Sequence, residues 1–459
     1  MSLTRRSLLV GAGTGAVAVL LAACTGQTEP KPRPTTPRPK PSAPAGVPRP
    51  KGWTRSAWST DPYSAGSVSY LPAGAAPEHR EALAESLDGR VFFAGEATDT
   101  SRPGTVLGAV DSGRRAAMAV IATAEDGERI AVIGAGASGA IAARTMADAG
   151  HELTIFEARD RTGGRILSVS DDSWPTPPQL GAWLVADADV TALQERLIDL
   201  GDGSIVFDSA SGRSQEGEAP SIDTAPVQQA IEQAKGYPAD LPLSEALQQN
   251  GADPSDPALA AALAWIEATT GADASLASSW YPPAIVPDAL TGRTGELSSF
   301  IDDRLDGLDV TLTSPVVRIA YDDRGVSLRL GTGEALSFDR VVVSVPLGVL
   351  QRQGIEFAPA LPFAQRGAIA ALGSGALETI WMRFDEPFWD AEATIWHVVG
   401  GDGLIRTWLN LEPATGEPVL VGLVGGAAAE QFAELSDTDA ETAALASLAY
   451  FAPAASDDA

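Results

Sequence analysis

The stretch that decides the fold is Arg129–Ile166, RIAVIGAGASGAIAARTMADAGHELTIFEARDRTGGRI. It opens on a short apolar run, Ile130–Ile133, of the kind that a buried parallel strand shows. A glycine-rich turn, Gly134–Gly139, follows, and after it an alanine-rich stretch predicts a helix. A second apolar run, Glu152–Phe156, predicts another strand. The order strand, turn, helix, strand predicts a Rossmann-like domain that binds a dinucleotide.

The spacing of the glycines has a physical reason. Gly134 allows a tight turn, Gly136 lets the backbone approach a pyrophosphate, and Gly139 lets the helix pack closely on the strand. The start of the helix offers N–H groups and a positive dipole end to the phosphates. Glu157, 23 residues after Gly134, can bind the ribose hydroxyls. A similar run, Gly11–Gly15, has no strand before it, so we assign no site to it.

Two further features extend this prediction to FAD. Arg159, Arg161 and Gly163–Arg165 form an extension of the ExxxRxGGR type, which distinguishes FAD-binding units from nicotinamide-binding ones. The alternative is another dinucleotide or a degenerate site. A separate stretch, Gly89–Ala117, reads GRVFFAGEATDTSRPGTVLGAVDSGRRAA. Together these segments resemble the flavin-containing amine oxidase family, which includes monoamine oxidases, polyamine oxidases and lysine-specific histone demethylases.

The resemblance covers residues 53–459, but its two main segments stand in the reverse of the family's order. Gly89–Ala117 resembles the end of such an enzyme, yet it precedes Arg129–Ile166, which resembles the beginning. Each segment occurs once, so the order indicates a circular permutation joined through Glu125–Glu128. The alternative is a truncated or misassembled gene. Further matching segments are Gln179–Leu184, Ser314–Ile319, Arg340–Leu350, Leu372–Trp389 and Pro418–Gly426.

The resemblance implies FAD as the cofactor and assigns residues to it. Glu96 is expected near the ribityl chain and the phosphates, Thr105 and Val106 beside the isoalloxazine ring, and the backbone of Val316 at the adenine. The cofactor-binding residues that we expect are Gly95, Glu96, Thr105, Val106, Gly134, Gly136, Ser138, Gly139, Glu157, Arg159, Gly163, Gly164, Arg165, Trp183, Leu184 and Val316.

The substrate side departs from the family. The family usually has a lysine at the position of Thr379, an aromatic residue at Val68 and a histidine at Leu107. Loss of the lysine removes a positive charge beside the flavin, which should slow electron transfer to O2. Loss of the aromatic residue should weaken the orientation of an amine. Tyr70, Trp58 and Trp408 are candidates for an aromatic lining of the site, ordinary core residues being the alternative.

Three functions fit these residues. The first is an FAD-dependent oxidoreductase that transfers a hydride from an amine or amino acid to flavin N5, with O2 or another acceptor reoxidising the flavin. The second is a membrane-tethered flavin dehydrogenase that acts on a non-amine substrate and passes electrons to a quinone. The third is a flavin-binding protein without amine oxidase activity. Production of H2O2, reduction of a dye without O2 consumption, and a flavin that no substrate reduces would distinguish them.

The N-terminus predicts an exported, lipid-anchored protein. Residues 1–23 hold Arg5, Arg6, an apolar run and Leu-Ala-Ala before Cys24, which indicates a twin-arginine-like signal peptide with a lipobox. An uncleaved membrane anchor is the alternative, although about 14 apolar residues are short for a bilayer. Residues 24–52 are rich in proline and basic side chains, which predicts an extended linker. We therefore expect the protein on the outer face of the cytoplasmic membrane.

Composition excludes several classes of site. Cys24 is the only cysteine, so the folded part holds no disulfide or cysteine-based metal site, and the three scattered histidines give no metal-ligand spacing. The chain carries 32 basic and 60 acidic side chains, for a net charge of −28. Such a charge argues against nucleic acid as a partner. It is compatible with a cationic substrate, and an acidic exported surface explains it equally well.

The sequence therefore predicts an α/β protein with a Rossmann-like FAD-binding domain and a mixed α+β substrate domain, arranged as a circularly permuted amine oxidase fold. The expected FAD-binding domain comprises residues 86–185 and 290–350. The expected substrate domain comprises residues 53–85, 186–289 and 351–459.

Overall fold

The computed structural model describes residue 44 and residues 46–185, 203–285, 289–295, 297–389 and 391–453. Residues Ser42–Ala459 form one compact unit. The predicted signal peptide, Cys24 and most of the predicted linker lie outside the described residues. The linker was expected to reach residue 52, but Val47 is buried and Gly52 already pairs with Arg383 in a strand. The packed chain therefore starts before the predicted end of the linker.

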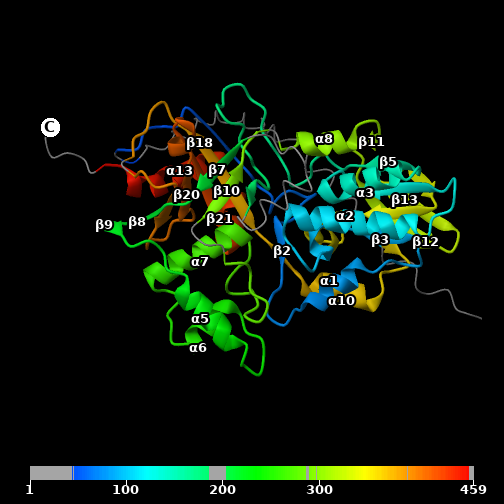
Figure 1. Cartoon of the computed structure of the whole chain (residues 1–459), viewed down its shortest axis with the longest axis horizontal. Helices are drawn as coiled ribbons and strands as arrows, with labels where there is room; N and C mark the ends of the chain where they lie inside the picture. Colours follow the sequence, from blue (N-terminus) through cyan, green and yellow to red (C-terminus); the bar gives the residue numbers. More distant parts are fainter. Residues whose placement is uncertain are drawn as a thin grey trace, which may run out of the picture. The chain divides into compact units, whose positions relative to one another are not determined.

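A parallel five-stranded sheet carries the predicted dinucleotide-binding unit (Figure 1). Its strands lie in the order β11 (Asp309–Thr311), β5 (Glu152–Phe156), β4 (Arg129–Ile133), β15 (Arg340–Val343) and β3 (Val91–Phe93). Ile130 and Val132 of β4 pack with helices α2 (Val106–Ile121) and α3 (Ala137–Asp148), which lie side by side in Figure 1. Ala131 and Ile133 face the other way, because successive side chains of a strand alternate. Coverage on both faces explains why β4 is almost entirely apolar.

A four-stranded sheet covers the second face of the parallel sheet. Its order is β14 (Ala335–Phe338), β13 (Gly325–Leu330), β12 (Val316–Asp322) and β16 (Glu356–Ala358). Ile319 and Leu328 of this sheet share a core with Ala131 and Ile133. β16 pairs with β12 although it follows residue 350, where the FAD-binding domain was expected to end. The division into two domains at the expected boundaries stays a prediction.

A seven-stranded sheet forms the other large layer. Its order is β1 (Gly52–Arg55), β18 (Leu377–Arg383), β21 (Val419–Gly425), β20 (Thr407–Asn410), β19 (Ile395–Val398), β8 (Ala210–Ser214) and β9 (Gly217–Ala219). Trp381 and Leu423 share a core with Trp265 of α7 (Pro257–Thr270). On the opposite face, Ile380 packs with Phe432 of α12 (Gly426–Glu434) and with α13 (Asp437–Leu448). Helices therefore cover both faces of this sheet.

Two small sheets connect these layers. β6 (Leu184–Val185), β10 (Leu290–Arg293) and β7 (Ser204–Phe207) form one, and β17 (Gly373–Gly375) and β2 (Val68–Tyr70) form the other. The remaining helices are α1 (Pro77–Ala84), η1 (Glu96–Thr98), α5 (Ala225–Ala234), α6 (Leu243–Gln249), α8 (Ser299–Leu305), α9 (Leu347–Gln351), α10 (Phe363–Ala371), α11 (Glu412–Thr415) and η2 (Ala449–Phe451). None of the helices in the described part has both the length and the apolarity that a bilayer crossing needs.

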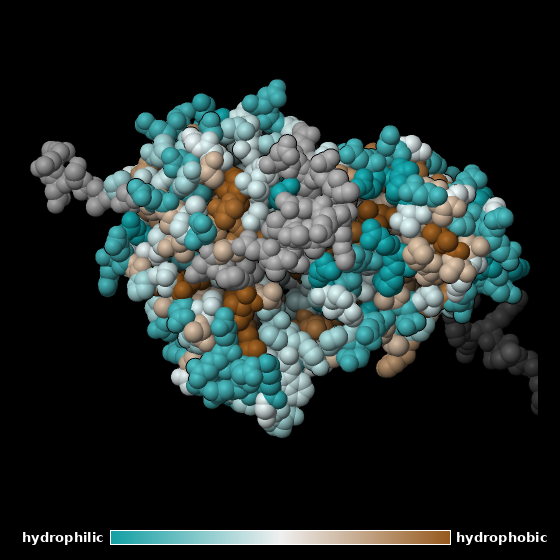
Figure 2. Space-filling view, viewed as in Figure 1, coloured by the Kyte–Doolittle hydropathy of each residue, from teal (hydrophilic) through white to brown (hydrophobic). Residues whose placement is uncertain are grey.

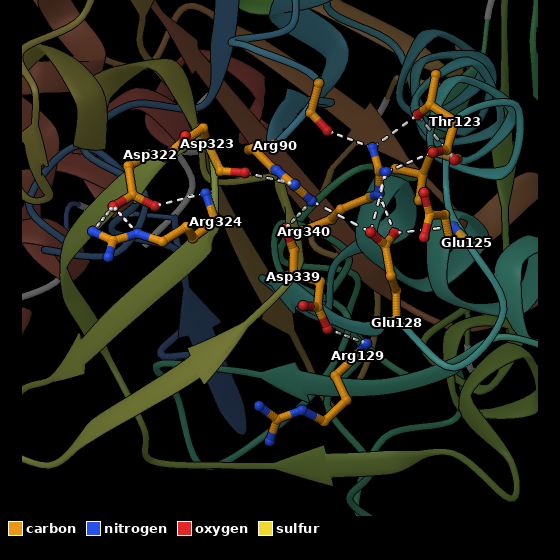
Figure 3. Close-up of polar contacts among 12 residues, drawn as sticks. Arg90, Thr123, Glu125, Glu128, Arg129, Asp322, Asp323, Arg324, Asp339 and Arg340 are labelled. Carbon is orange, nitrogen blue, oxygen red and sulfur yellow. Dashed lines mark hydrogen bonds and ion pairs between the residues drawn. The ribbon is translucent and has the colours of Figure 1, made fainter.

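The connection between α2 and β4 is tied down by ion pairs. Figure 3 shows Glu128, the last residue before β4, between two arginine side chains. Glu128 accepts hydrogen bonds from Arg340 Nε at 2.5 Å and from Arg90 Nη1 at 3.3 Å. Arg340 also donates to the backbone oxygens of Gly89 and Thr123. This network joins three strands of the parallel sheet to the end of α2.

The network also sets the charge of Glu128. Burial by itself raises the pKa of its carboxyl, but the hydrogen bonds from Arg340 and from the Glu125 backbone, with the charges of Arg340 and Arg90, outweigh burial and lower it. Glu128 is therefore ionised at neutral pH. The short connection that the sequence predicted at Glu125–Glu128 is an ordered, hydrogen-bonded part of the fold.

Candidate active site

A cavity of about 880 Å³ runs from the glycine-rich turn to the seven-stranded sheet. Gly134, Gly136 and Glu157 line it at one end, and Tyr70 and Thr379 line it at the other. Cofactor and ligand pockets in proteins span roughly 300–1,000 Å³. Figure 2 shows apolar surface beside α7 and β2, two elements whose residues line this cavity. A single space thus connects the predicted cofactor end with the predicted substrate end.

The glycine-rich turn leaves no room for side chains where the sequence has glycine. Gly134 has a φ of +102°, a left-handed conformation that favours glycine. A Cβ atom at Gly139 would lie 1.9 Å from the carbonyl oxygen of Gly134. Helix α3 begins directly after its N-cap, Gly136, so its first N–H groups lie at the cavity. This geometry is the one that accommodates a pyrophosphate.

Glu157 is fixed at the end of β5, beside the same turn. Its Oε2 accepts a hydrogen bond from the Ala135 N–H at 2.8 Å, and its Oε1 accepts one from the Arg159 N–H at 2.9 Å. The carboxylate is buried and lines the cavity. In a parallel sheet, ligands bind outside the carboxyl ends of the strands, which is where Glu157 lies.

Glu96 ties three walls of the cavity together. It accepts hydrogen bonds from Ser69 Oγ at 2.6 Å, the Gly104 N–H at 2.9 Å and Arg165 Nη1 at 3.0 Å. Burial by itself raises the pKa of Glu96, but the charge of Arg165, the Ser69 hydrogen bond and the charge of Arg80 together lower it. A charged carboxylate is thus held at the wall between β2, the start of α2 and the Gly163–Arg165 turn.

The structure brings most of the predicted cofactor residues to one surface. Those that line the cavity are Glu96, Thr105, Val106, Gly134, Gly136, Ser138, Glu157, Arg159, Gly163, Gly164, Arg165, Trp183, Leu184 and Val316. Gly139 packs behind the turn, and Gly95, with a φ of +121°, shapes the backbone before Glu96. The indole N–H of Trp183 is buried at the wall with no hydrogen-bond partner in the described residues, so it can donate to a bound molecule. These features fit FAD.

Five of the six predicted substrate-side residues line the cavity. Thr379, on β18, lines the cavity, and its Oγ1 has no hydrogen-bond partner within the described part of the chain. Trp58, Val68, Tyr70 and Leu107 also line it. Burial, with the charges of nearby acidic residues, raises the pKa of Tyr70 to about 12. Tyr70 therefore keeps its proton at any physiological pH.

Trp408 is a correction to the sequence-based prediction. It is not part of the cavity wall but lies in the core on the opposite face of the seven-stranded sheet, where its Nε1 donates to Ser447 Oγ at 2.9 Å. Its neighbour Leu409 shares a core with Trp381 instead. Side chains of a strand alternate between faces, so Trp408 and Leu409 cannot both face the cavity side. The alternative of an ordinary core residue was right for Trp408.

The sequence analysis did not identify Glu378, which supports the cavity wall through hydrogen bonds to residues 56–59. Glu378 accepts hydrogen bonds from Ser56 Oγ at 2.5 Å, the Trp58 N–H at 3.0 Å and the Ser59 N–H at 2.9 Å. Burial raises the pKa of Glu378, although these hydrogen bonds oppose the rise. The carboxyl positions Trp58, whose side chain lines the cavity. No sequence signal could reveal these contacts, because their partners lie about 320 residues apart.

Comparisons with known proteins agree with this geometry. A family model described as flavin containing amine oxidoreductase matches residues 39–121 and 221–459, and a model of the NAD(P)-binding Rossmann-like domain matches residues 132–190. Polyamine oxidase 4 of Oryza sativa subsp. japonica is 31% identical over 366 residues, which cover 72% of this chain and 74% of that protein. Lysine-specific histone demethylase 2 of Homo sapiens is 27% identical over 359 residues, covering 70% and 43%.

Solved structures show the same fold. Putrescine oxidase in its wild-type form bound to putrescine matches with a TM-score of 0.55 and 20% identity, over 71% of this chain and 81% of that chain. Cyclohexylamine oxidase from Brevibacterium oxydans IH-35A matches with a TM-score of 0.56 and 19% identity, over 71% and 82%. The amine oxidase fold with a Rossmann-like domain is therefore confirmed.

Fold and site together define an FAD-dependent oxidoreductase. The chain belongs to the flavin-containing amine oxidase family. Its cofactor is FAD, as the sequence predicted.

Proposed function

We propose that this oxidoreductase acts on a small amine or amino acid at the Thr379 end of the cavity, and that O2 or a quinone takes up the electrons. The observation that carries the proposal is the single cavity that joins the glycine-rich turn to Tyr70 and Thr379. The names of the relatives, polyamine oxidases and a putrescine oxidase among them, support an amine as substrate. FAD, when bound, supplies the acceptor for a hydride from the substrate carbon.

The chain's own residues bind and orient the substrate. Val68 and Leu107 give the wall an apolar surface that excludes water and favours an amine in its neutral form. Tyr70 keeps its phenol proton, so it can both donate and accept a hydrogen bond. Thr379 offers a hydroxyl group where the family usually has a lysine. Positioning of the substrate, with no obligatory acid or base among these residues, is then the main contribution of the protein.

The test starts with an absorbance spectrum of the purified mature protein. Anaerobic mixing with a panel of monoamines, diamines, polyamines and amino acids should then bleach the flavin with at least one compound. H2O2 formed in air identifies O2 as the acceptor, and reduction of a quinone analogue without H2O2 identifies a quinone. A flavin that dithionite reduces but no amine or amino acid does would refute the proposal.

We also propose that the chain is a circular permutation of the family's order. The amine oxidase model matches on both sides of the Rossmann-like match, which supports this reading. The ends of the described unit also lie close together: a Cβ atom at Gly46 would be 3.3 Å from Ala452 Cβ. A short link between these ends would therefore replace the Glu125–Glu128 connection without moving the packed elements.

Reordering the gene tests the permutation. A chain that starts at Arg129, joins residue 453 to residue 46 through a few glycines and ends after Ile121 should fold, bind FAD and melt near the temperature of the natural order. If both orders are expressed equally but the reordered chain stays unfolded or binds no flavin, the proposal is contradicted.

The location of the protein is a further part of the proposal. The residues before Cys24 support export and lipid attachment, and the proline-rich residues 24–52 support a tether to the outer face of the cytoplasmic membrane. Substitution Cys24→Ser should move the protein from the membrane fraction to the soluble exported fraction. An unchanged membrane fraction for this variant would refute lipid attachment at Cys24.

A further inference from the structure

An arginine without any motif lies buried in the wall of the FAD cavity. Arg80, on α1, is 2% exposed and lines the cavity. Its Nη1 donates to Ser69 Oγ at 2.7 Å and to the Ala97 carbonyl oxygen at 3.1 Å, and its Nη2 donates to the Ser69 carbonyl oxygen at 3.3 Å. Burying a guanidinium is costly unless its hydrogen bonds are well placed, so this position needs a reason.

The hydrogen bonds of Ser69 explain why an arginine is buried at this position. The Ser69 hydroxyl accepts a hydrogen bond from Arg80 and gives its own proton to Glu96 Oε2 at 2.6 Å, while Glu96 Oε1 accepts from Arg165 at 3.0 Å. A hydroxyl has only one proton, so the donation from Arg80 fixes the direction in which Ser69 points it. We call Arg80, Ser69, Glu96 and Arg165 the Arg80 network.

The Arg80 network connects the two ends of the cavity. Arg165 and Glu96 belong to the predicted cofactor wall, and Glu96 also binds the N–H of Gly104, the residue before Thr105. Ser69 lies in β2 between Val68 and Tyr70, on the substrate wall. Asp99 is the other carboxylate near Arg80, but its Oδ1 accepts from the N–H groups of Ser101 and Arg102. The cation of Arg80 therefore acts on Glu96 through Ser69.

We propose that Arg80 is a cofactor-positioning residue, which orients Glu96 through the Ser69 hydroxyl and so fixes the cavity wall that receives FAD. The charge of Arg80 also lies at the cavity, where it favours the electron-rich, reduced form of a bound flavin. The proposal rests on FAD as the cofactor and is independent of the substrate, so a failed amine screen leaves it standing.

Three variants separate position from charge. Arg80→Met removes both the charge and the hydrogen bonds. Arg80→Lys keeps the charge but loses the planar fork of the guanidinium. Ser69→Ala interrupts the Arg80 network, while Arg80 keeps its hydrogen bond to the Ala97 carbonyl oxygen. Arg324→Met is the matched control, because the Arg324 side chain is 86% exposed and forms an ion pair with Asp322. The measurements are the FAD dissociation constant by titration of the apoprotein, the flavin midpoint potential, and the melting temperatures of the apo and FAD-bound forms.

Arg80→Met should weaken FAD binding at least about tenfold, which corresponds to one lost hydrogen bond to a charged group, and should lower the midpoint potential. Ser69→Ala should weaken binding to a similar extent with a smaller change in potential, and Arg80→Lys should keep the potential near that of the wild type. If Arg80→Met does not fold, the other two variants decide. Wild-type FAD affinity in folded Ser69→Ala or in folded Arg80→Met would overturn the proposal. An unchanged potential in Arg80→Met would overturn only the effect of the Arg80 charge on the flavin.

Discussion

Replacing Glu128 by glutamine should destabilise the protein at the connection between α2 and β4. The change keeps the shape of the side chain but removes its charge. Arg340 and Arg90 then lose the carboxylate that they share, and their side chains are only 8% and 20% exposed. Neither arginine can be fully hydrated in place of the lost partner, because most of each side chain is buried. Figure 3 shows the hydrogen bonds and ion pairs that these side chains make.

The size of the effect follows from this burial. Loss of a hydrogen bond to a charged group costs about 1.5–3 kcal/mol. Breaking a fully buried ion pair costs about 3–5 kcal/mol, an upper bound here because the Glu128 side chain keeps 15% of its exposure. We therefore expect Glu128→Gln to lower the free energy of unfolding by about 2–3 kcal/mol at pH 7. Urea unfolding followed by circular dichroism measures it, with the FAD content held constant.

The control is Asp322→Asn, which breaks the exposed pair of Asp322 and Arg324. That variant should leave the free energy of unfolding close to that of the wild type, because exposed ion pairs contribute little to stability. Because the folded-state pKa of Glu128 lies below its ordinary value of 4.5, its stabilisation is complete above that value and is lost as the pH falls through the folded-state pKa. The difference in the free energy of unfolding between the wild type and Glu128→Gln should therefore disappear at acidic pH. A Glu128→Gln variant that matches Asp322→Asn at pH 7 would refute the reasoning.

Three other predictions concern the cavity and the sheet beside it. Gly139→Ala should abolish FAD binding and lower the melting temperature, because its Cβ would lie 1.9 Å from the Gly134 oxygen; a variant that retains flavin would contradict this. Thr379→Lys should speed the reoxidation of chemically reduced flavin by O2, since a positive charge favours electron transfer to oxygen, whereas Thr379→Met should not; equal stopped-flow rates would show that Thr379 is not near the reacting ring. Burial lowers the pKa of His397 to about 4, below its ordinary 6.5, so the fold holds the neutral ring and stability should fall as the pH drops from about 6.5 towards 4. Replacing it by Phe, which preserves the edge-to-face contact with Trp265, should flatten that part of the urea-midpoint profile, and an unaltered profile would exclude His397 as its cause.

The parts of the fold that the sequence predicted well are those governed by neighbours along the chain. β4 and β5 lie where the two apolar runs predicted strands, and α3 occupies the alanine-rich stretch between them. Hydrophobic periodicity and the glycine-rich turn are enough for these elements, because both act over a few residues. The glycine positions follow from backbone sterics, so Gly134 and Gly139 could be placed without the fold.

The substrate wall was harder to predict, because it depends on which face of a strand turns inward. Thr379 and Trp408 were both candidates for the substrate side, yet Trp408 faces the core on the other side of its sheet. Every residue of β20 and β21 is buried, so alternation between buried and exposed positions does not distinguish the two faces of these strands. Only the helices that cover each face settle the question.

The sequence by itself determined the nucleotide-binding turn, its acidic partner Glu157 and the kinship with FAD enzymes, since these depend on short-range sterics and local spacing. The tertiary structure alone decided which distant segments share a wall. It placed Ser69 and Arg80 against Glu96, and it brought Gly46 beside Ala452. Such contacts arise from the packing of whole layers, where residues far apart in the chain meet because their elements bury a common core, and no local pattern records them.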